Sequence, residues 1–264
     1  MIDIHSHILP ELDDGAGSLQ ESLAMGRLAA ADGIRAIVAT PHVITGLYPH
    51  SRETILEATA QLQRVFTDNS IFLDILPGAE YRLESDLPQR MSRGELLTIN
   101  DTGRYLLVEL PADLVPDHTD LVFYELQLQG VTPVIAHPER NAAFARSPRH
   151  LHELVRRGAL AQVTSGSLTG LMGTAAATTA RAFLKQGCVH FIASDAHSSG
   201  RRAPVLTDAL KEASRLVGTD EAQNLVAGNP HRAIQGLGIK TGEIKNIKPA
   251  GRGISQFLKQ IFTR

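Results

Sequence analysis

The stretch that decides the fold is Thr132-Pro133-Val134-Ile135-Ala136-His137-Pro138-Glu139-Arg140, in which a short apolar run passes directly into His137 and Arg140. The run has the length and the β-branched content of a buried strand. A helical pattern precedes it from Pro116 to Gln129, and Gly130 ends that pattern. The stretch therefore predicts a helix, a tight connection and a buried strand that leads into polar residues.

The same alternation of apolar runs and helical patterns continues along most of the chain. We expect further strands at residues 2–4, 34–39, 71–76, 105–110, 160–163 and 189–193, and further helices at residues 18–31, 51–66, 86–93, 149–157, 175–185, 204–217, 221–226 and 230–235. Strands that alternate with helices indicate a parallel sheet with right-handed crossovers. About seven such units in roughly 240 residues favour a TIM-like β/α barrel, with a doubly wound open sheet as the alternative.

No linker rich in Pro, Gly or Ser divides residues 1–238, so we expect one domain there and a separate basic tail at residues 239–264. The segment from Lys240 to Arg264 has six Lys or Arg residues and one Glu, and residues 254–262 have the pattern of a short amphipathic helix. We favour a solvated tail, and docking to an acidic surface or partner is the alternative.

Composition excludes several classes of protein. The formal net charge of −2 does not indicate nucleic-acid binding. The first residues lack the basic and apolar regions of a secretory signal, and the uncharged residues 158–180 are too rich in Gly, Ser and Thr for a transmembrane segment. The single cysteine, Cys188, excludes an intrachain disulfide. We therefore expect a cytoplasmic protein, and the sequence leaves its oligomeric state open.

Nearly every predicted strand ends in residues that can bind a metal ion. Because the carboxyl ends of parallel strands meet at one mouth of a barrel, where barrel enzymes have their active sites, these side chains should converge. The candidate ligands are His5, His7, Asp14, His42, Glu80, Glu109, His137, Asp195 and His197. Imidazole and carboxylate together suit Zn, Mn or Fe better than Ca or Mg. Spacing alone does not decide whether Asp13 or Asp14 is the ligand and which one caps a turn.

The other six histidines are interpreted as ordinary packing or surface residues, which is the usual role of an isolated histidine. They are His50, His118, His150, His152, His190 and His231. The same interpretation does not suit the candidate ligands, because chance would have to place all of them at the same end of the fold. Metal binding is therefore the favoured hypothesis.

The number of candidate ligands is too large for one four-coordinate ion and suits two or three ions with bridging carboxylates. Such ions lower the pKa of bound water, so that a bound hydroxide can attack in line, and they stabilise the attacking and leaving oxygens, which favours phosphoryl transfer. We expect Arg140, Arg201 and Arg202 at the same mouth as a phosphate clamp. A cysteine phosphatase is disfavoured because Ser194, and no arginine, stands six residues after Cys188.

The ordered motifs resemble the PHP (polymerase and histidinol phosphatase) family. They are His5-Ser6-His7, Asp14, Thr40-Pro41-His42, Gly78-Ala79-Glu80, Glu109, His137-Pro138-Glu139-Arg140 and Ser194-Asp195-Ala196-His197. The stretches 5–15 and 194–202 are most similar to its bacterial protein-tyrosine phosphatase branch, the capsule-regulating CpsB and YwqE type. The resemblance covers about residues 1–238 and implies a distorted, roughly seven-stranded β/α barrel.

The resemblance also implies a site with three ions. His5, His7, Glu80 and Asp195 would hold the first ion, Glu80, Glu109 and His137 the second, and Asp14, His42 and His197 the third. Asp14 rather than Asp13 is then a ligand, and Arg202 matches the second phosphate-binding arginine better than Arg201. Manganese is the implied metal, with iron or zinc as alternatives. The implied partner is a phosphotyrosine protein, a bacterial tyrosine kinase that controls exopolysaccharide export.

Three alternatives remain at this stage. The same ions would serve a phosphatase for a small phosphomonoester such as histidinol phosphate, which would need a closed pocket where a protein substrate needs an open mouth. A metal-dependent amidohydrolase is less favoured, because it commonly needs a lysine where the fourth strand ends in Glu109. A non-catalytic scaffold would be expected to lack some ligands, and none is lost here.

Overall fold

A computed structural model describes residues 1–240, and the tail predicted at residues 239–264 lies outside the described residues from position 241 onward. The strands are β1 (Ile2–Ser6), β2 (Ala36–Ala39), β3 (His42–Val43), β4 (Asp74–Pro77), β5 (Glu80–Arg82), β6 (Tyr105–Glu109), β7 (Thr132–Ala136), β8 (Leu160–Thr164) and β9 (Phe191–Ala193). The helices are α1 (Leu19–Ala31), α2 (Arg52–Asp68), α3 (Leu87–Ser92), α4 (Thr119–Leu128), α5 (Ala142–Arg146), α6 (Pro148–Arg156), α7 (Ser165–Leu168), α8 (Thr174–Gln186), α9 (Thr207–Val217), α10 (Thr219–Gln223) and α11 (Asn229–Ile234).

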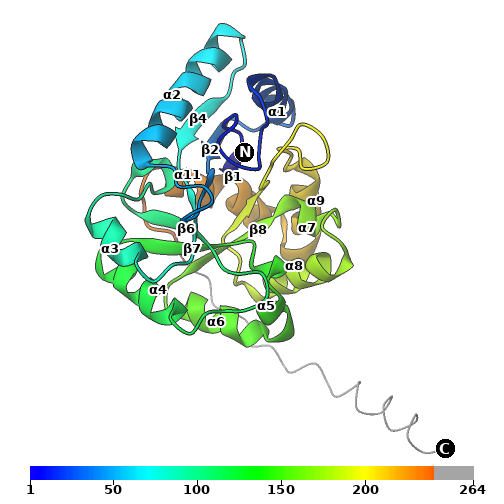
Figure 1. Cartoon of the computed structure of the whole chain (residues 1–264). Helices are drawn as coiled ribbons and strands as arrows, with labels where there is room; N and C mark the ends of the chain where they lie inside the picture. The colour runs from blue at the N-terminus through cyan, green and yellow to red at the C-terminus, as the bar shows by residue number, and fades with distance from the viewer. Residues whose placement is uncertain (241–264) are drawn as a thin grey trace, which may run out of the picture.

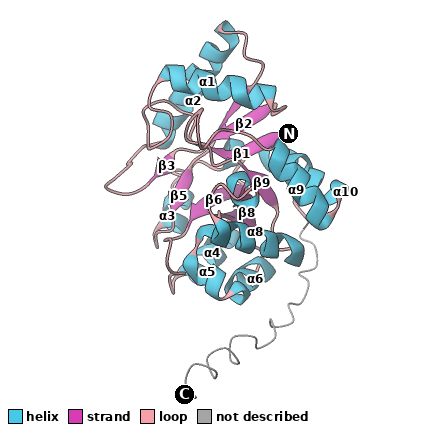
Figure 2. Cartoon of the chain, turned by 90° about the vertical axis from the view of Figure 1, so that its right-hand side faces the viewer, coloured by secondary structure: helices cyan, strands magenta, loops and turns pink. Residues whose placement is uncertain are grey.

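The strands form two parallel sheets, in the orders β1-β2-β4 and β3-β5-β6-β7-β8-β9. Backbone hydrogen bonds join the sheets where β1 meets the segment after β9: Asp195 N donates to His5 O, and His7 N donates to Ala196 O, each at 2.8 Å. The strands lie at the centre of the molecule with the helices outside them (Figure 1), and Figure 2 shows the same arrangement from the side. The predicted α/β fold with parallel, barrel-like strands is confirmed.

The interior is apolar on both faces of the strands. Ile4, Val38 and Leu107, from three different strands, belong to one buried cluster. Their chain neighbours Ile37 and Leu106 belong to a second, larger cluster that includes residues of the helices. Successive side chains of a strand point to opposite faces, so one face of each strand packs inside the group of strands and the other packs against helices.

Two short strands were not predicted. β3 and β5 follow β2 and β4 after only two residues each, and they pair with each other in the second sheet, with His42 opposite Glu80. The prediction that His42 and Glu80 lie beyond the ends of single strands is therefore wrong. Strands of two or three residues are too short to show an alternating pattern, so sequence reading misses them. The short helices α5 and α7 were missed for the same reason.

The predicted starts of the first two helices are confirmed. Ser18 Oγ accepts a hydrogen bond from Glu21 N, and Ser51 Oγ accepts one from Thr54 N, each at 3.2 Å. Such caps satisfy backbone N–H groups that have no partner within the helix. Within residues 1–240, no helix is both long and apolar enough to cross a membrane.

The contact between α1 and α2 yields a test of the packing. A Cβ atom added at Gly26 would lie 2.5 Å from two ring carbons of the fully buried Phe66. Gly26→Ala would gain up to about 1 kcal/mol of helix propensity. We nevertheless expect a net loss of roughly 1–3 kcal/mol in the free energy of unfolding, because a packed ring must move. Urea unfolding followed by circular dichroism measures this.

Gly17→Ala is the matched control, because nothing lies within 4 Å of a Cβ added there. Its unfolding free energy should stay within about 0.5 kcal/mol of the unmodified chain. Equal stability of the Gly26 variant and the unmodified chain would show that the α1–α2 contact is looser than described.

Candidate metal centre

Most of the predicted ligand side chains lie near the carboxyl ends of strands or in the loops that follow, whereas His42 and Glu80 are the first residues of β3 and β5. All of them meet in one cluster. Among residues 1–240, three groups of side chains each place ligand atoms within 4.8 Å of one another and could hold a metal ion. The groups are His7, Asp14, His42 and His197; His5, His7 and Glu80; and His42, Glu80 and Glu109. The groups share members, so the cluster is continuous.

The tightest part of the cluster contains two imidazoles and two carboxylates, all buried. His5 Nε2 and His7 Nε2 lie 3.2 Å apart. Glu80 Oε2 is 3.3 Å from each of these nitrogens, and Asp195 Oδ1 is 3.4 Å from each. Ligand atoms held at about 2.0–2.2 Å in a tetrahedron around one ion are roughly 3.3–3.6 Å apart. These four atoms therefore fit a single divalent ion.

The second part of the cluster lies around the other oxygen of Glu80. His137 Nε2 is 3.0 Å from Glu80 Oε1 and 3.8 Å from Glu109 Oε1. Burial and then the charge of Glu80 raise the pKa of Glu109. Glu80 Oε2 and Glu109 Oε2 are buried without a hydrogen-bond partner among residues 1–240. Two neighbouring carboxylates with unpaired oxygens are a setting that a cation would stabilise.

The third part is the most exposed. Asp14 Oδ1 is 3.4 Å from His197 Nε2 and 3.8 Å from His42 Nε2, and the Asp14 side chain is 53% exposed. The other nitrogen of His42, Nδ1, lies 3.1 Å from Glu80 Oε2. The hydrogen bond from His197 comes first among the effects that lower the pKa of Asp14 to about 2. This part of the cluster opens toward solvent.

The protonation of the cluster shows how strongly it favours positive charge. Burial by itself would raise the pKa of Glu80 and of Asp195, but the nearby imidazoles outweigh it and hold both pKa values well below the ordinary range. Burial would lower the pKa of His5 and His7, yet the carboxylates around them raise both. The buried imidazoles and carboxylates thus favour each other's charged forms, and a divalent ion held by the same atoms would likewise compensate the carboxylates.

The two aspartates that the sequence could not separate have different surroundings. Asp13 is directed away from the other carboxylates: its Oδ2 lies 2.6 Å from His7 Nδ1 and accepts from His42 N at 2.8 Å, while its Oδ1 accepts from Gly15 N at 3.0 Å. Asp14 alone of the pair belongs to a potential metal group. Asp13 therefore orients His7 so that its Nε2 faces the cluster.

Two further supporting residues were missed in the sequence. Gln162 Oε1 lies 2.8 Å from His5 Nδ1, so it orients His5 as Asp13 orients His7. Asp3 Oδ1 accepts from Ser194 N at 2.9 Å and holds the segment that carries Asp195. The sequence signal was weak, because each is only a polar residue between two apolar residues of a strand. In the structure, burial raises the pKa of Asp3 to about 6.

Two of the candidate ligands have strained backbones. His137 has φ 31° and Asp195 has φ 51°, both in the left-handed region. Such conformations cost on the order of 1–3 kcal/mol each and are concentrated at functional sites. His137 is the first and Asp195 the second residue after a strand, where the backbone must turn to direct the side chain into the cluster.

The predicted arginines separate into two that reach the cluster and one that does not contact it. Arg202 Nη2 donates to Asp195 Oδ2 at 2.7 Å, and Arg140 Nη1 donates to the same oxygen. Arg201 is exposed. Arg140 and Arg202 thus approach one carboxylate from two different loops, and this places two guanidinium groups beside the potential metal ligands.

The six histidines interpreted as ordinary residues lie outside the three potential metal groups. His190 is an example: its Nδ1 accepts from Ala161 N at 3.1 Å, and burial lowers its pKa to about 4. His50 stacks against Tyr48 at 6.4 Å between ring centroids.

Comparison with known proteins identifies the family to which the chain is similar. Residues 1–235 match the family described as capsular polysaccharide synthesis, CpsB/CapC. The tyrosine-protein phosphatase YwqE of Bacillus subtilis is 44% identical over 75% of this chain and 78% of its own length. The tyrosine-protein phosphatase CpsB of Streptococcus pneumoniae is 31% identical over 89% of this chain and 98% of its own length.

The structure also superposes on a crystal structure from work on YwqE of Bacillus subtilis and CpsB of Streptococcus pneumoniae, which are described there as unique metal-dependent tyrosine phosphatases. The TM-score is 0.90 at 39% identity, and the match covers 94% of this chain and 100% of the other. The chain therefore belongs to the CpsB/CapC family of capsular polysaccharide synthesis proteins.

Proposed function

We propose that this protein is a metal-dependent protein-tyrosine phosphatase. The observation that carries the proposal is the set of four buried ligand atoms from His5, His7, Glu80 and Asp195, whose spacing fits one ion, with two arginines beside it. The family relatives named tyrosine-protein phosphatases support the same activity. The crystal structure described as metal-dependent supports the need for ions.

The proposed ligand sets follow the three parts of the cluster. His5, His7, Glu80 and Asp195 would hold one ion; Glu80, Glu109 and His137 a second; and Asp14, His42 and His197 a third. Mixed imidazole and carboxylate ligands support manganese, with iron or zinc as alternatives. Bound ions would supply a water of lowered pKa and would neutralise charge on the phosphate oxygens.

The protein groups around the ions have separate tasks. Arg140 and Arg202 would bind the phosphate, because a guanidinium fork matches two phosphate oxygens and both forks already reach Asp195. Asp13 and Gln162 keep His7 and His5 oriented toward the ions. Positioning and charge stabilisation of this kind account for most of phosphoryl-transfer catalysis.

The openness of the cluster favours a protein substrate over a small phosphomonoester such as histidinol phosphate. The Asp14 side chain is 53% exposed, and those of Arg140 and Arg202 are 33% and 28% exposed. A phosphotyrosine on a protein could therefore reach the arginines without a lid having to open. The capsular family supports a bacterial tyrosine kinase as the partner. The position that a lysine would take in an amidohydrolase is Glu109, which disfavours C–N bond cleavage.

The phosphatase activity should depend on bound metal and on its ligand His5. The manganese-loaded protein should hydrolyse a phosphotyrosine peptide, measured as phosphate release. Loss of a residue that only hydrogen-bonds to a metal ligand typically costs roughly 10–100-fold in activity. His5→Ala removes a ligand itself, so it should lower kcat/KM by more than that. His150→Ala, which changes an exposed histidine outside the cluster, should have no effect. Metal-loaded protein that leaves the peptide intact would refute the proposed function.

The adjacent arginines Arg201 and Arg202 should differ in their importance for activity. Arg202→Ala should lower kcat/KM by about 10²–10³-fold and weaken inhibition by inorganic phosphate, because it removes a charged donor beside the reacting group. Arg201→Ala should stay within a few-fold of the unmodified enzyme, since that side chain is exposed. A larger loss for Arg201→Ala than for Arg202→Ala would reverse the assignment.

Asp13 should support metal binding, because its two oxygens accept from three N–H groups. Asp13→Asn replaces one acceptor by a donor, so at least one N–H group loses its partner. We expect metal affinity to fall about tenfold in a chelator-competition titration. Asp32→Asn is the control: Asp32 accepts from Leu206 N and Thr207 N away from the cluster, so its loss should alter stability but not metal affinity. Equal metal affinities for the two variants would contradict a role for Asp13.

A further inference from the structure

A pocket of about 200 Å³ lies directly beside the metal centre, at the ends of β6 and β7 and next to α5. One side of it is formed by the candidate ligands Glu109 and His137 together with Arg140. The remaining wall consists of Leu110, Ala112, Ala136, Pro138, Asn141 and Phe144. The pocket therefore joins a highly charged side to a mainly apolar one.

Asn141, the one uncharged polar side chain in the pocket wall, is engaged elsewhere. Its Nδ2 donates to Pro111 O at 2.7 Å and to Leu114 O at 3.0 Å, and its Oδ1 accepts from Phe144 N at 2.9 Å. These bonds tie the loop after β6 to α5 and hold the wall in place. The Asn141 amide is therefore already hydrogen-bonded within the protein, and the wall offers a ligand mainly apolar contact.

The volume of the pocket is suited to one aromatic ring. In another protein, an engineered cavity of about 150 Å³ lined by Leu, Ile and Phe admits benzene. A pocket of about 200 Å³ has room for a ring with its substituents but not for a larger group. A phosphate attached to such a ring would lie toward His137 and Arg140, where the charged groups are.

We propose that this pocket is the binding subsite for the aryl ring of an aryl phosphate. The inference rests on the proposed phosphatase function and extends it by naming the surface that selects phosphotyrosine. A phosphoserine or phosphothreonine has no ring, so it would leave the apolar wall uncovered and gain no burial there. Selection for the aryl ester then comes from contact with Ala112 and with the accessible edge of Leu110.

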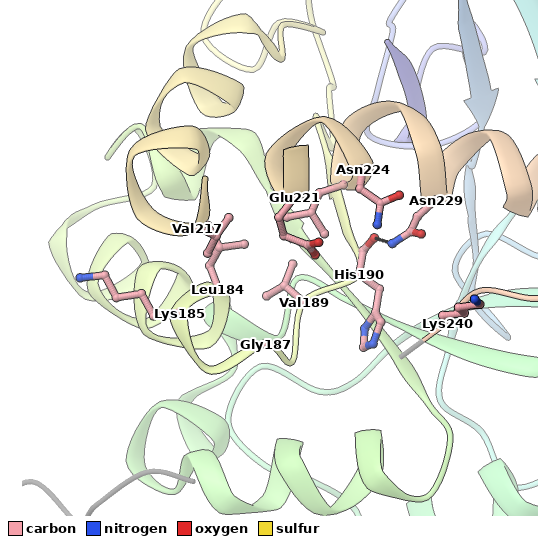
Figure 3. Close-up of a pocket in the computed structure, with 11 residues that line it drawn as sticks. Leu184, Lys185, Gly187, Val189, His190, Val217, Glu221, Asn224, Asn229 and Lys240 are labelled. Atoms are coloured by element: carbon pink, nitrogen blue, oxygen red, sulfur yellow. Dashed lines mark hydrogen bonds between the residues drawn. The ribbon is translucent and has the colours of Figure 1, made fainter. Parts of the chain in front are cut away.

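Two other features of the described residues suit the ring less well. Tyr48 lies at the mouth, but its ring is nearly parallel to His42 at 10° and to His50 at 18°, so its neighbours are already imidazoles. The larger pocket of about 550 Å³ shown in Figure 3 is lined by His190 and Asn229. His190 precedes β9, whereas Asp195 and His197 follow it, so that pocket lies at the opposite end of the strand.

The experiment fills the pocket and compares two phosphate analogues. Ala112 is exposed, so Ala112→Phe should fold while its ring occupies the proposed subsite. Ala145→Phe makes the same change at an exposed position of α5 that does not line the pocket. Binding of phenylphosphonate and methylphosphonate to the manganese-loaded protein is measured by calorimetry, and thermal unfolding checks that each variant is folded.

We expect the unmodified protein to bind phenylphosphonate at least tenfold more tightly than methylphosphonate. Ala112→Phe should abolish that preference and leave methylphosphonate binding within threefold, and Ala145→Phe should change neither. The inference is overturned if the unmodified protein shows no preference for phenylphosphonate or if that preference survives Ala112→Phe. It is also overturned if the preference is lost in Tyr48→Leu and not in Ala112→Phe. Failure to hydrolyse a phosphotyrosine peptide would be a separate result, because it refutes the proposed function and leaves the aryl preference to be measured independently.

Discussion

The structure depends on one buried carboxylate. Glu80 is 1% exposed, and its two oxygens lie within 3.3 Å of nitrogens from His5, His7, His42 and His137. Removing a carboxylate from water costs several kcal/mol unless close partners compensate it. The partners come from β1 and the residue after it, from the start of β3 and from the turn after β7, so these residues must lie at the same depth and on the same side. Parallel strands meet that condition, because their carboxyl ends share one mouth.

The bonds that join the two sheets also position the ligands. His5 O and His7 N pair with the backbone of Asp195 and Ala196, so the same hydrogen bonds connect β1 to the end of the second sheet and bring Asp195 to the two histidines. The left-handed backbone of Asp195 is held there by Asp3, which accepts from the preceding residue, Ser194. A change that loosens this junction should therefore disturb the fold and the cluster together.

Much of this arrangement could be predicted from the sequence, and the limits have physical causes. Strand runs such as residues 132–136 are long enough to show their pattern, and the polar residues after them mark the mouth. β3 and β5 are too short for any pattern, so the direct pairing of His42 with Glu80 was not foreseen. The roles of Asp13 and Gln162 depend on contacts across the fold, and spacing along the chain carries no information about them.

The surface that would select the substrate is likewise harder to predict from the sequence than the metal cluster. The cluster is built at strand ends, where position in the chain determines position in space, so its chemistry follows from residue type and order. The wall beside it is built from the loop after β6 and from α5, a five-residue helix with no detectable period. Loops vary in shape while strand ends do not, which is how one barrel supports many reactions. In the proposed function, ions and arginines would account for cleavage of a phosphate ester, and the preference for one ester over another would come from the loop surface around Ala112.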